Sequence, residues 1–233
     1  MKPDSPLVAR IVSVARDLGS LANDVVFIGG AIAPLLHTDT RIPRVRPTKD
    51  VDGVVLSDNY GSGERLRAAL RARGFTHDTS NTAHVHRWVT PRGVSFDLVL
   101  SGVHAGGSGN PWDAEAIASA IVATVSDVTF RHAAAPAFIA MKLQAFSDRG
   151  NGDLRASHDI EDVLALIANR SSIVTDFFAA DLRVRSIVRR FAVSLLDGDT
   201  AEEVLSAHLN NADDVAATVR LASVRLTKIA QLP

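Results

Sequence analysis

The sequence predicts an α+β protein: a mixed β-sheet with flanking helices, followed by an all-helical C-terminal half. In the first part of the chain, short apolar runs that suit strands alternate with segments of helical periodicity. After Pro136, helical periodicity continues to the end. We therefore expect two domains, residues 1–132 and residues 133–233.

The N-terminal half should alternate helices and strands. Its first helix places Leu7, Ile11 and Leu18 on one face and meets Gly19 as a stop signal. The turn of a later hairpin is marked by Pro91-Arg92-Gly93. The expected elements are a helix at 6–19, a strand at 24–28, a helix at 31–37, a strand at 50–56, a helix at 59–73, hairpin strands at 84–90 and 93–100, and short strands within 117–131.

The C-terminal half carries apolar residues at helical spacing. The expected helices lie at 136–148, 157–169, 174–196, 200–208 and 211–231. One of them has a run of basic residues, formed by Arg183, Arg185, Arg189 and Arg190. Such a run is either a solvated face or a contact for an RNA backbone, and salt-dependent binding would separate the two.

Composition excludes several classes of protein. With 46% apolar residues the chain reads as globular, and its net charge of −1 provides no global field for nucleic acid. The lack of cysteine rules out disulfides, thiolate zinc sites and a cysteine nucleophile, and fits a cytoplasmic protein. No apolar run reaches the length of a membrane span, so we expect no membrane partner.

A pair of carboxylates carries the strongest chemical signal. Asp50 and Asp52 stand at the start of the apolar run that ends at Leu56. Residues i and i+2 of a strand point to the same face, so both acids should enter one pocket. Two adjacent acids are costly unless a cation neutralises them, and Mg²⁺ takes oxygen ligands of this kind. The pair therefore predicts metal-assisted phosphoryl or nucleotidyl transfer, although an isolated pair of this spacing would more often be a solvated strand end.

A third acid, Asp97, lies inside a later apolar strand. Alternation puts Ser95, Asp97 and Val99 on one face and the larger apolar residues on the other. A carboxylate in such a strand needs a partner or a metal, unless this face is exposed to solvent. Asp97 could help hold a metal and accept the proton of an attacking hydroxyl.

Two further features adjoin the acids in sequence. Gly29-Gly30, between an expected strand and helix, lets backbone approach an anionic ligand closely, although a tight structural turn is the simpler reading. A basic run ahead of the acid pair could contact phosphates or be a solvated loop. Its members are Arg41, Arg44, Arg46 and Lys49.

Together, these motifs resemble the nucleotidyltransferase superfamily that includes DNA polymerase β and the aminoglycoside nucleotidyltransferases. The likeness is closer to the AbiEii/MenT-type toxin nucleotidyltransferases, and it covers roughly residues 24–170. The stretches that carry it are Val26 to Gly30, Val45 to Asp52 with Thr48 between Arg46 and Asp50, Asp97, Ala140 to Phe146, Arg149, and Ser157 to Asp162.

The resemblance implies a nucleotidyltransferase core in 1–132 and a helical domain in 133–233. It implies that Asp50, Asp52, Asp97 and Lys142 are catalytic. The three acids would bind Mg²⁺ or Mn²⁺, and Lys142 would contact the triphosphate of an NTP. The other implied nucleotide-binding residues are Gly29, Gly30, Arg46, Thr48, Lys49, Asp159 and Asp162. One departure is Gly30, which stands where the superfamily usually has serine, so backbone N–H groups would have to hold the phosphate.

The expected function is therefore Mg²⁺-dependent transfer of an NMP from an NTP to an acceptor hydroxyl. The resemblance points to RNA, such as a tRNA 3′ end, as the acceptor, and to a toxin with a cognate antitoxin protein. Three alternatives remain open: a small-molecule acceptor of the aminoglycoside type, a protein hydroxyl, and a non-catalytic relative that binds nucleotide.

Overall fold

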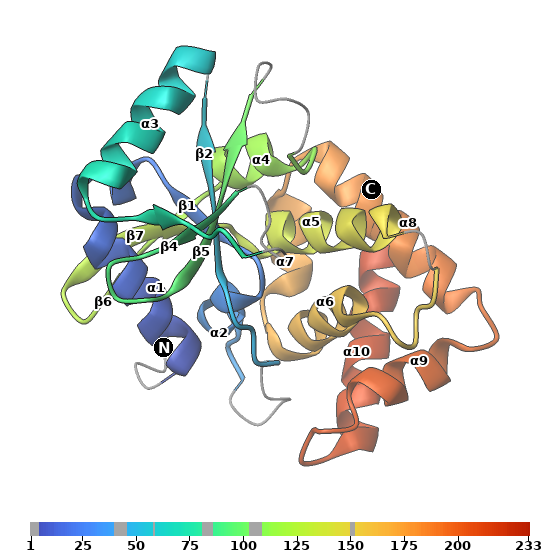
Figure 1. Ribbon diagram of the computed structural model, residues 1–233. Coiled ribbons are helices and arrows are strands. Elements are labelled where there is room, and N and C mark those ends of the chain that lie inside the picture. The colour runs from blue at the N-terminus through green and yellow to red at the C-terminus, as the bar shows by residue number, and fades with distance from the viewer. Residues whose placement is uncertain (1–4, 40–45, 58, 81–85, 103–108, 150–151) are drawn as a thin grey trace. The chain divides into compact units, whose positions relative to one another are not determined.

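The computed structural model describes residues 5–39, 46–57, 59–80, 86–102, 109–149 and 152–233 (Figure 1). By internal contacts the chain divides into two compact units. The first comprises Met1–Leu35 and Pro47–Ala134, and the second comprises Leu36–Arg46 and Ala135–Pro233. The α+β fold with a helical C-terminal half is confirmed.

A mixed sheet forms the centre of the first unit. Within the described residues it has seven strands in the order β3-β4-β5-β2-β1-β7-β6. The pairs β2–β5 and β1–β7 are parallel and the other neighbours are antiparallel. The strands are β1 (Val26–Ile28), β2 (Val51–Leu56), β3 (Thr76–His77), β4 (Arg87–Val89), β5 (Ser95–Ser101), β6 (Ile121–Val125) and β7 (Val128–His132).

Helices cover the two faces of this sheet. The side chain of Leu100 on β5 lies so close to Gly63 of α3 that a β-carbon on the glycine would meet it at 2.9 Å. The neighbouring Val99 points to the other face, towards Gly109 and the start of α4. The helical elements are α1 (Pro6–Leu18), η1 (Gly19–Asn23), η2 (Gly30–Ile32), α2 (Ala33–Leu36), α3 (Tyr60–Ala72) and α4 (Asp113–Ala118).

The second unit is a set of packed helices around α6. All but two of the residues of α6 are buried, which marks it as the central helix. Side chains on neighbouring segments satisfy its C-terminal end: Arg225 donates to the carbonyls of Ile167 and Ala168, and Asn169 binds Thr38 and Asp39. The helices are α5 (Ala135–Asp148), α6 (His158–Asn169), α7 (Ile173–Ala179), α8 (Leu182–Leu196), α9 (Ala201–His208) and α10 (Val215–Ala230).

Most of the predicted elements are present in the predicted order, whereas η1 and the short strand β3 were not expected. The single helix expected at 174–196 is wrong, because Ala180 is extended and the Asp181 carboxylate caps the N-terminus of a new helix, α8. Helix α4 was not expected, and its last residues fall in the segment assigned to strands. No described helix is both long and apolar enough to cross a bilayer.

Candidate active site

Strand register gathers the three acids on one face of the sheet. Asp52 on β2 pairs in parallel register with Asp97 on β5, so both side chains point to the same side. Asp50 lies in a bend one residue before β2, and its carboxylate is near that of Asp97 because Nη2 of Arg87 donates to both. On the other flank of β2, Ile28 pairs with Asp52 and leads directly into the glycine turn. Sequence alternation predicted the face of each acid, and the pairing of β2 with β5 brings the acids together.

Gly29 makes room for the carboxylate of Asp52. Its backbone has φ 70° and ψ −170°, a region that is essentially open only to glycine. A β-carbon at this position would lie 2.0 Å from Oδ2 of Asp52 and 2.8 Å from its Cγ. The Asp52 carboxylate therefore rests directly against the backbone of the Gly29-Gly30 turn, as a close-approach role for these glycines requires.

Arg87 on β4 bridges two of the acids. Its Nε and Nη2 donate to Oδ1 and Oδ2 of Asp97 at 2.7 and 2.6 Å, which is a bidentate pair. The same Nη2 lies 2.8 Å from Oδ2 of Asp50. The hydrogen bond to Asp97 is the main cause that raises the pKa of Arg87 above its usual range, although partial burial opposes it. The guanidinium of Arg87 thus neutralises charge on these acids, a role that the sequence predicted for a metal ion.

A second set of contacts fixes the segment that leads into the acid pair. The hydroxyl of Thr48 donates to Oδ1 of Asp50 at 2.8 Å. Arg10 on α1 donates to the backbone carbonyls of Thr48 and Lys49 at 2.7 and 3.1 Å. Arg46 belongs to the second unit, while Arg41 and Arg44 lie outside the described residues. These contacts hold Thr48 and Lys49 beside Asp50, to which the hydroxyl of Thr48 is hydrogen-bonded.

The donor types at this site suit a hard divalent ion. Carboxylate oxygens on adjacent strands are ligands that Mg²⁺ accepts. Nevertheless, the described part of the chain contains no cluster of three His, Cys, Asp or Glu side chains that could hold a metal. Arg87 engages both oxygens of Asp97. The acids fit the ion chemically, and Arg87 would have to release Asp97 before all three could act as ligands.

The predicted residues of the second unit form a separate buried charge cluster. Lys142 on α5 lies 3.3 Å from Asp159 and 2.6 Å from Asp162, both on α6. Arg149 reaches Asp159 at 2.7 Å. Oδ2 of Asp162 is within ion-pair distance of Lys142, and Oδ2 of Asp159 is within ion-pair distance of Arg149, but neither contact has hydrogen-bonding geometry. Helical spacing predicted the shared faces, and the packing of α5 on α6 joins them.

A histidine adjoins this cluster. Burial lowers the pKa of His37 to about 4, while the charge of Asp162 opposes that shift. His37 is therefore neutral near pH 7. The lysine remains the cation that neutralises Asp162, which leaves Lys142 shared between two buried carboxylates.

Sequence reasoning missed Arg87. The signal was present in the expected hairpin, because a turn at Pro91-Arg92-Gly93 that pairs Val89 with Ser95 also pairs Arg87 with Asp97. Directly opposite residues of opposite charge on one face of a hairpin are expected to interact. The contact of Arg87 with Asp50 could not be foreseen, because it depends on the pairing of β5 with β2.

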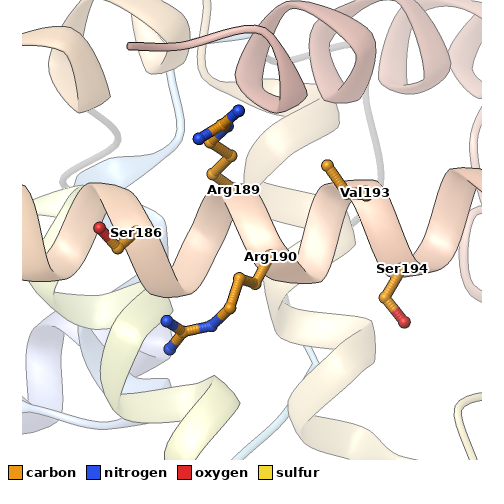
Figure 2. Close-up of a pocket in the computed structure, with 5 residues that line it drawn as sticks. All are labelled: Ser186, Arg189, Arg190, Val193 and Ser194. Atoms are coloured by element: carbon orange, nitrogen blue, oxygen red, sulfur yellow. The ribbon is translucent and has the colours of Figure 1, made fainter.

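Two arginines of α8 bond to the ends of neighbouring helices. Arg185 donates to the carbonyls of Phe178 and Ala180, and Arg189 donates to the carbonyl of Ala230, so both complete the ends of neighbouring helices. A shallow hollow of about 540 Å³ lies along α8, where Arg189 and Arg190 point in different directions (Figure 2). Its other lining residues are Ser186, Val193 and Ser194. Two of the four arginines of the run are thus engaged with backbone carbonyls, while Arg183, Arg189 and Arg190 are exposed.

Comparison with solved structures identifies the kind of fold. The chain is similar to an antigenic nucleotidyltransferase-like protein from Paracoccidioides brasiliensis, with 17% identity, a TM-score of 0.53, and coverage of 91% of this chain and 95% of that chain. It also matches JHP933 from Helicobacter pylori with 15% identity, a TM-score of 0.46, and coverage of 98% and 93%. No protein-family profile and no curated protein matches the sequence. The first likeness shows a nucleotidyltransferase-like fold.

Proposed function

We propose that this protein is a Mg²⁺-dependent nucleotidyltransferase that moves an NMP from an NTP to an acceptor hydroxyl. The observation that carries the proposal is the pairing of Asp52 with Asp97 on adjacent strands of a nucleotidyltransferase-like fold, with Asp50 joined to Asp97 through Arg87. Asp52 also rests against the Gly29-Gly30 turn, whose backbone can approach a phosphate closely. A purely structural strand end has no need of three acids on one face.

The reaction assigns a role to each acid. Asp50, Asp52 and Asp97 would hold Mg²⁺ or Mn²⁺, which supplies neutralisation of charge on the triphosphate when bound. Asp97 would accept the proton of the acceptor hydroxyl as the oxygen of that hydroxyl bonds to the α-phosphorus. The bond between the α-phosphorus and the bridging oxygen then breaks, and pyrophosphate leaves. Catalysis rests mainly on positioning and electrostatic stabilisation.

The remaining nucleotide contacts are predictions from the family resemblance. Lys142 would have to exchange one of its two carboxylate partners for a phosphate oxygen. Thr48 would give up its bond to Asp50, or keep it and orient that acid. The further residues proposed to contact nucleotide are Gly29, Gly30, Arg46, Lys49, Asp159 and Asp162.

For the acceptor we propose the 3′ end of an RNA, with tRNA as the first candidate and a toxin role with an antitoxin partner. The support is the resemblance to AbiEii/MenT-type toxins. The test is incubation of the purified protein with Mg²⁺, each labelled NTP in turn and total RNA. We expect label in RNA from the wild type and none from Asp50→Asn, which preserves the shape of the side chain.

Equal labelling by the two proteins would refute the assignment of Asp50. If neither protein labels RNA, the RNA acceptor is refuted. Release of pyrophosphate from an NTP with an aminoglycoside or a protein as acceptor would then indicate another member of the same enzyme class.

One observation favours a second candidate, a non-catalytic protein that binds nucleotide. Arg87 already neutralises part of the acid cluster, so the site is stable without a metal. Calorimetry separates the two candidates. Tight NTP binding that is independent of Mg²⁺, together with no pyrophosphate release for any acceptor, would favour the binding protein.

A further inference from the structure

We propose that Arg87 is an intramolecular competitor of the divalent ion: its guanidinium occupies the acid cluster without metal and must leave Asp97 when metal binds. The proposal rests on the proposed function, because it concerns how that site is loaded. It predicts that Arg87 weakens metal binding, instead of supporting it.

The hydrogen bonds of Arg87 define the competition. Both oxygens of Asp97 accept from this side chain, and one oxygen of Asp50 accepts from the same Nη2. A divalent ion bound by Asp50 and Asp97 needs oxygens from the same two carboxylates. It would also stand next to a fixed positive charge, which repels it. Metal and guanidinium therefore bind the acids as alternatives.

The position of Arg87 is built into the sheet. Arg87 and Asp97 are directly opposite each other in the antiparallel pair β4–β5, so the backbone register sets their contact. Both side chains are largely buried but keep some contact with solvent, with 19% of Arg87 and 14% of Asp97 exposed. A long arginine side chain that keeps some access to water can leave its partner without breaking a strand.

Charge explains why such a cation is useful. Without a counter-ion, three carboxylates on adjacent strands would repel one another and destabilise the fold. Arg87 offsets one of these charges in the metal-free protein. It thereby keeps the acids close together, and it sets a threshold of metal concentration for loading the site.

The test measures binding of Mn²⁺ to the full chain without nucleotide, and the electron paramagnetic resonance signal of free Mn²⁺ reports the binding. Arg87→Gln removes the positive charge and retains hydrogen-bonding capacity. Its matched control is Arg92→Gln, which removes the same charge from the same hairpin, where Arg92 pairs with Asp17. Competing ligands are typically coupled by about 5- to 150-fold, so Arg87→Gln should bind Mn²⁺ at least about fivefold more tightly than wild type. Arg92→Gln should bind like wild type.

A second measurement uses the unaltered side chain. In ¹⁵N-labelled wild type, the Nε–H signal of Arg87 is assigned by its loss in Arg87→Lys. Adding Mg²⁺ should move this signal to the position of a solvated guanidinium. This readout keeps the proposal testable if Arg87→Gln folds poorly.

The outcomes separate this inference from the proposed function. Unchanged or weaker Mn²⁺ binding by Arg87→Gln, or an Arg87 signal that Mg²⁺ does not move, would overturn the competition. If neither wild type nor Arg87→Gln binds Mn²⁺ in a manner abolished by Asp52→Asn, both ideas fail. If Arg87→Gln binds more tightly while no acceptor is labelled, the competition stands and only the transferase activity is refuted.

Discussion

Gly29→Ala should disturb both the fold and the acid cluster. The first cost is conformational, because the φ of 70° and ψ of −170° belong to a region essentially reserved for glycine. Holding an alanine there costs about 1–3 kcal/mol. The second cost is steric, because the new β-carbon would lie 2.0 Å from Oδ2 of Asp52.

The size of the steric cost follows from ordinary contact distances. Non-bonded heavy atoms approach to roughly 3.5 Å, so the Asp52 carboxylate must move by more than about 1 Å. Overpacking of this kind costs about 1–3 kcal/mol. We therefore expect Gly29→Ala to lower the free energy of unfolding by about 2–6 kcal/mol in total.

Gly93→Ala is the matched control. Gly93 also has a positive φ, 77°, but a β-carbon there would meet no atom within 4 Å. It should cost only the backbone preference, about 1–2 kcal/mol. Urea unfolding followed by circular dichroism measures both variants, and Mn²⁺ binding should weaken only in Gly29→Ala. Equal destabilisation by the two substitutions, with unchanged Mn²⁺ binding, would refute the close contact between Gly29 and Asp52.

Two further substitutions test buried charges by urea unfolding. Lys142→Met should lower the free energy of unfolding by about 3–5 kcal/mol, because it removes a cation shared by two buried acids. Arg149→Met alters a side chain that is 63% exposed, and it should cost less than about 1 kcal/mol. Similar losses for the two variants would contradict this reasoning. Burial raises the pKa of Asp113 from 3.8 to about 6. The protonated form therefore contributes stability that is complete below the unfolded pKa and is lost as the pH rises through about 6. Between about pH 4 and pH 7, the stability of Asp113→Asn should therefore rise by about 1–3 kcal/mol relative to that of wild type. Parallel curves of stability against pH for the two proteins would refute this.

Local patterns in the sequence predicted most elements, because apolar periodicity reports which face of a segment is buried. They failed at 174–196, where apolar residues continue at helical spacing across the break. There, the Asp181 carboxylate bonds to the backbone N–H of Arg183 and starts α8 in a new direction. A capping hydrogen bond between a side chain and a backbone group two residues away does not alter the helical spacing of the apolar residues, so this spacing does not reveal the break.

The acid cluster shows the same division. Alternation along each strand indicated the side on which Asp50, Asp52 and Asp97 lie. Their convergence required β5 to pair in parallel with β2 at the register that aligns Asp52 with Asp97. The intervening chain returns through α3, β3 and β4, so no local spacing specifies that register.

The sequence by itself determined the chemical character of this protein: paired acids on a buried strand, a glycine turn before them and a helical second half. Only the tertiary structure decided which cation neutralises those acids, because Arg87 reaches Asp50 across a strand that is distant in sequence. It also decided that Lys142 is divided between two acids of another helix. The sequence determines which side chains carry a charge, whereas packing determines which charged groups meet, since electrostatic interaction depends on distance in space.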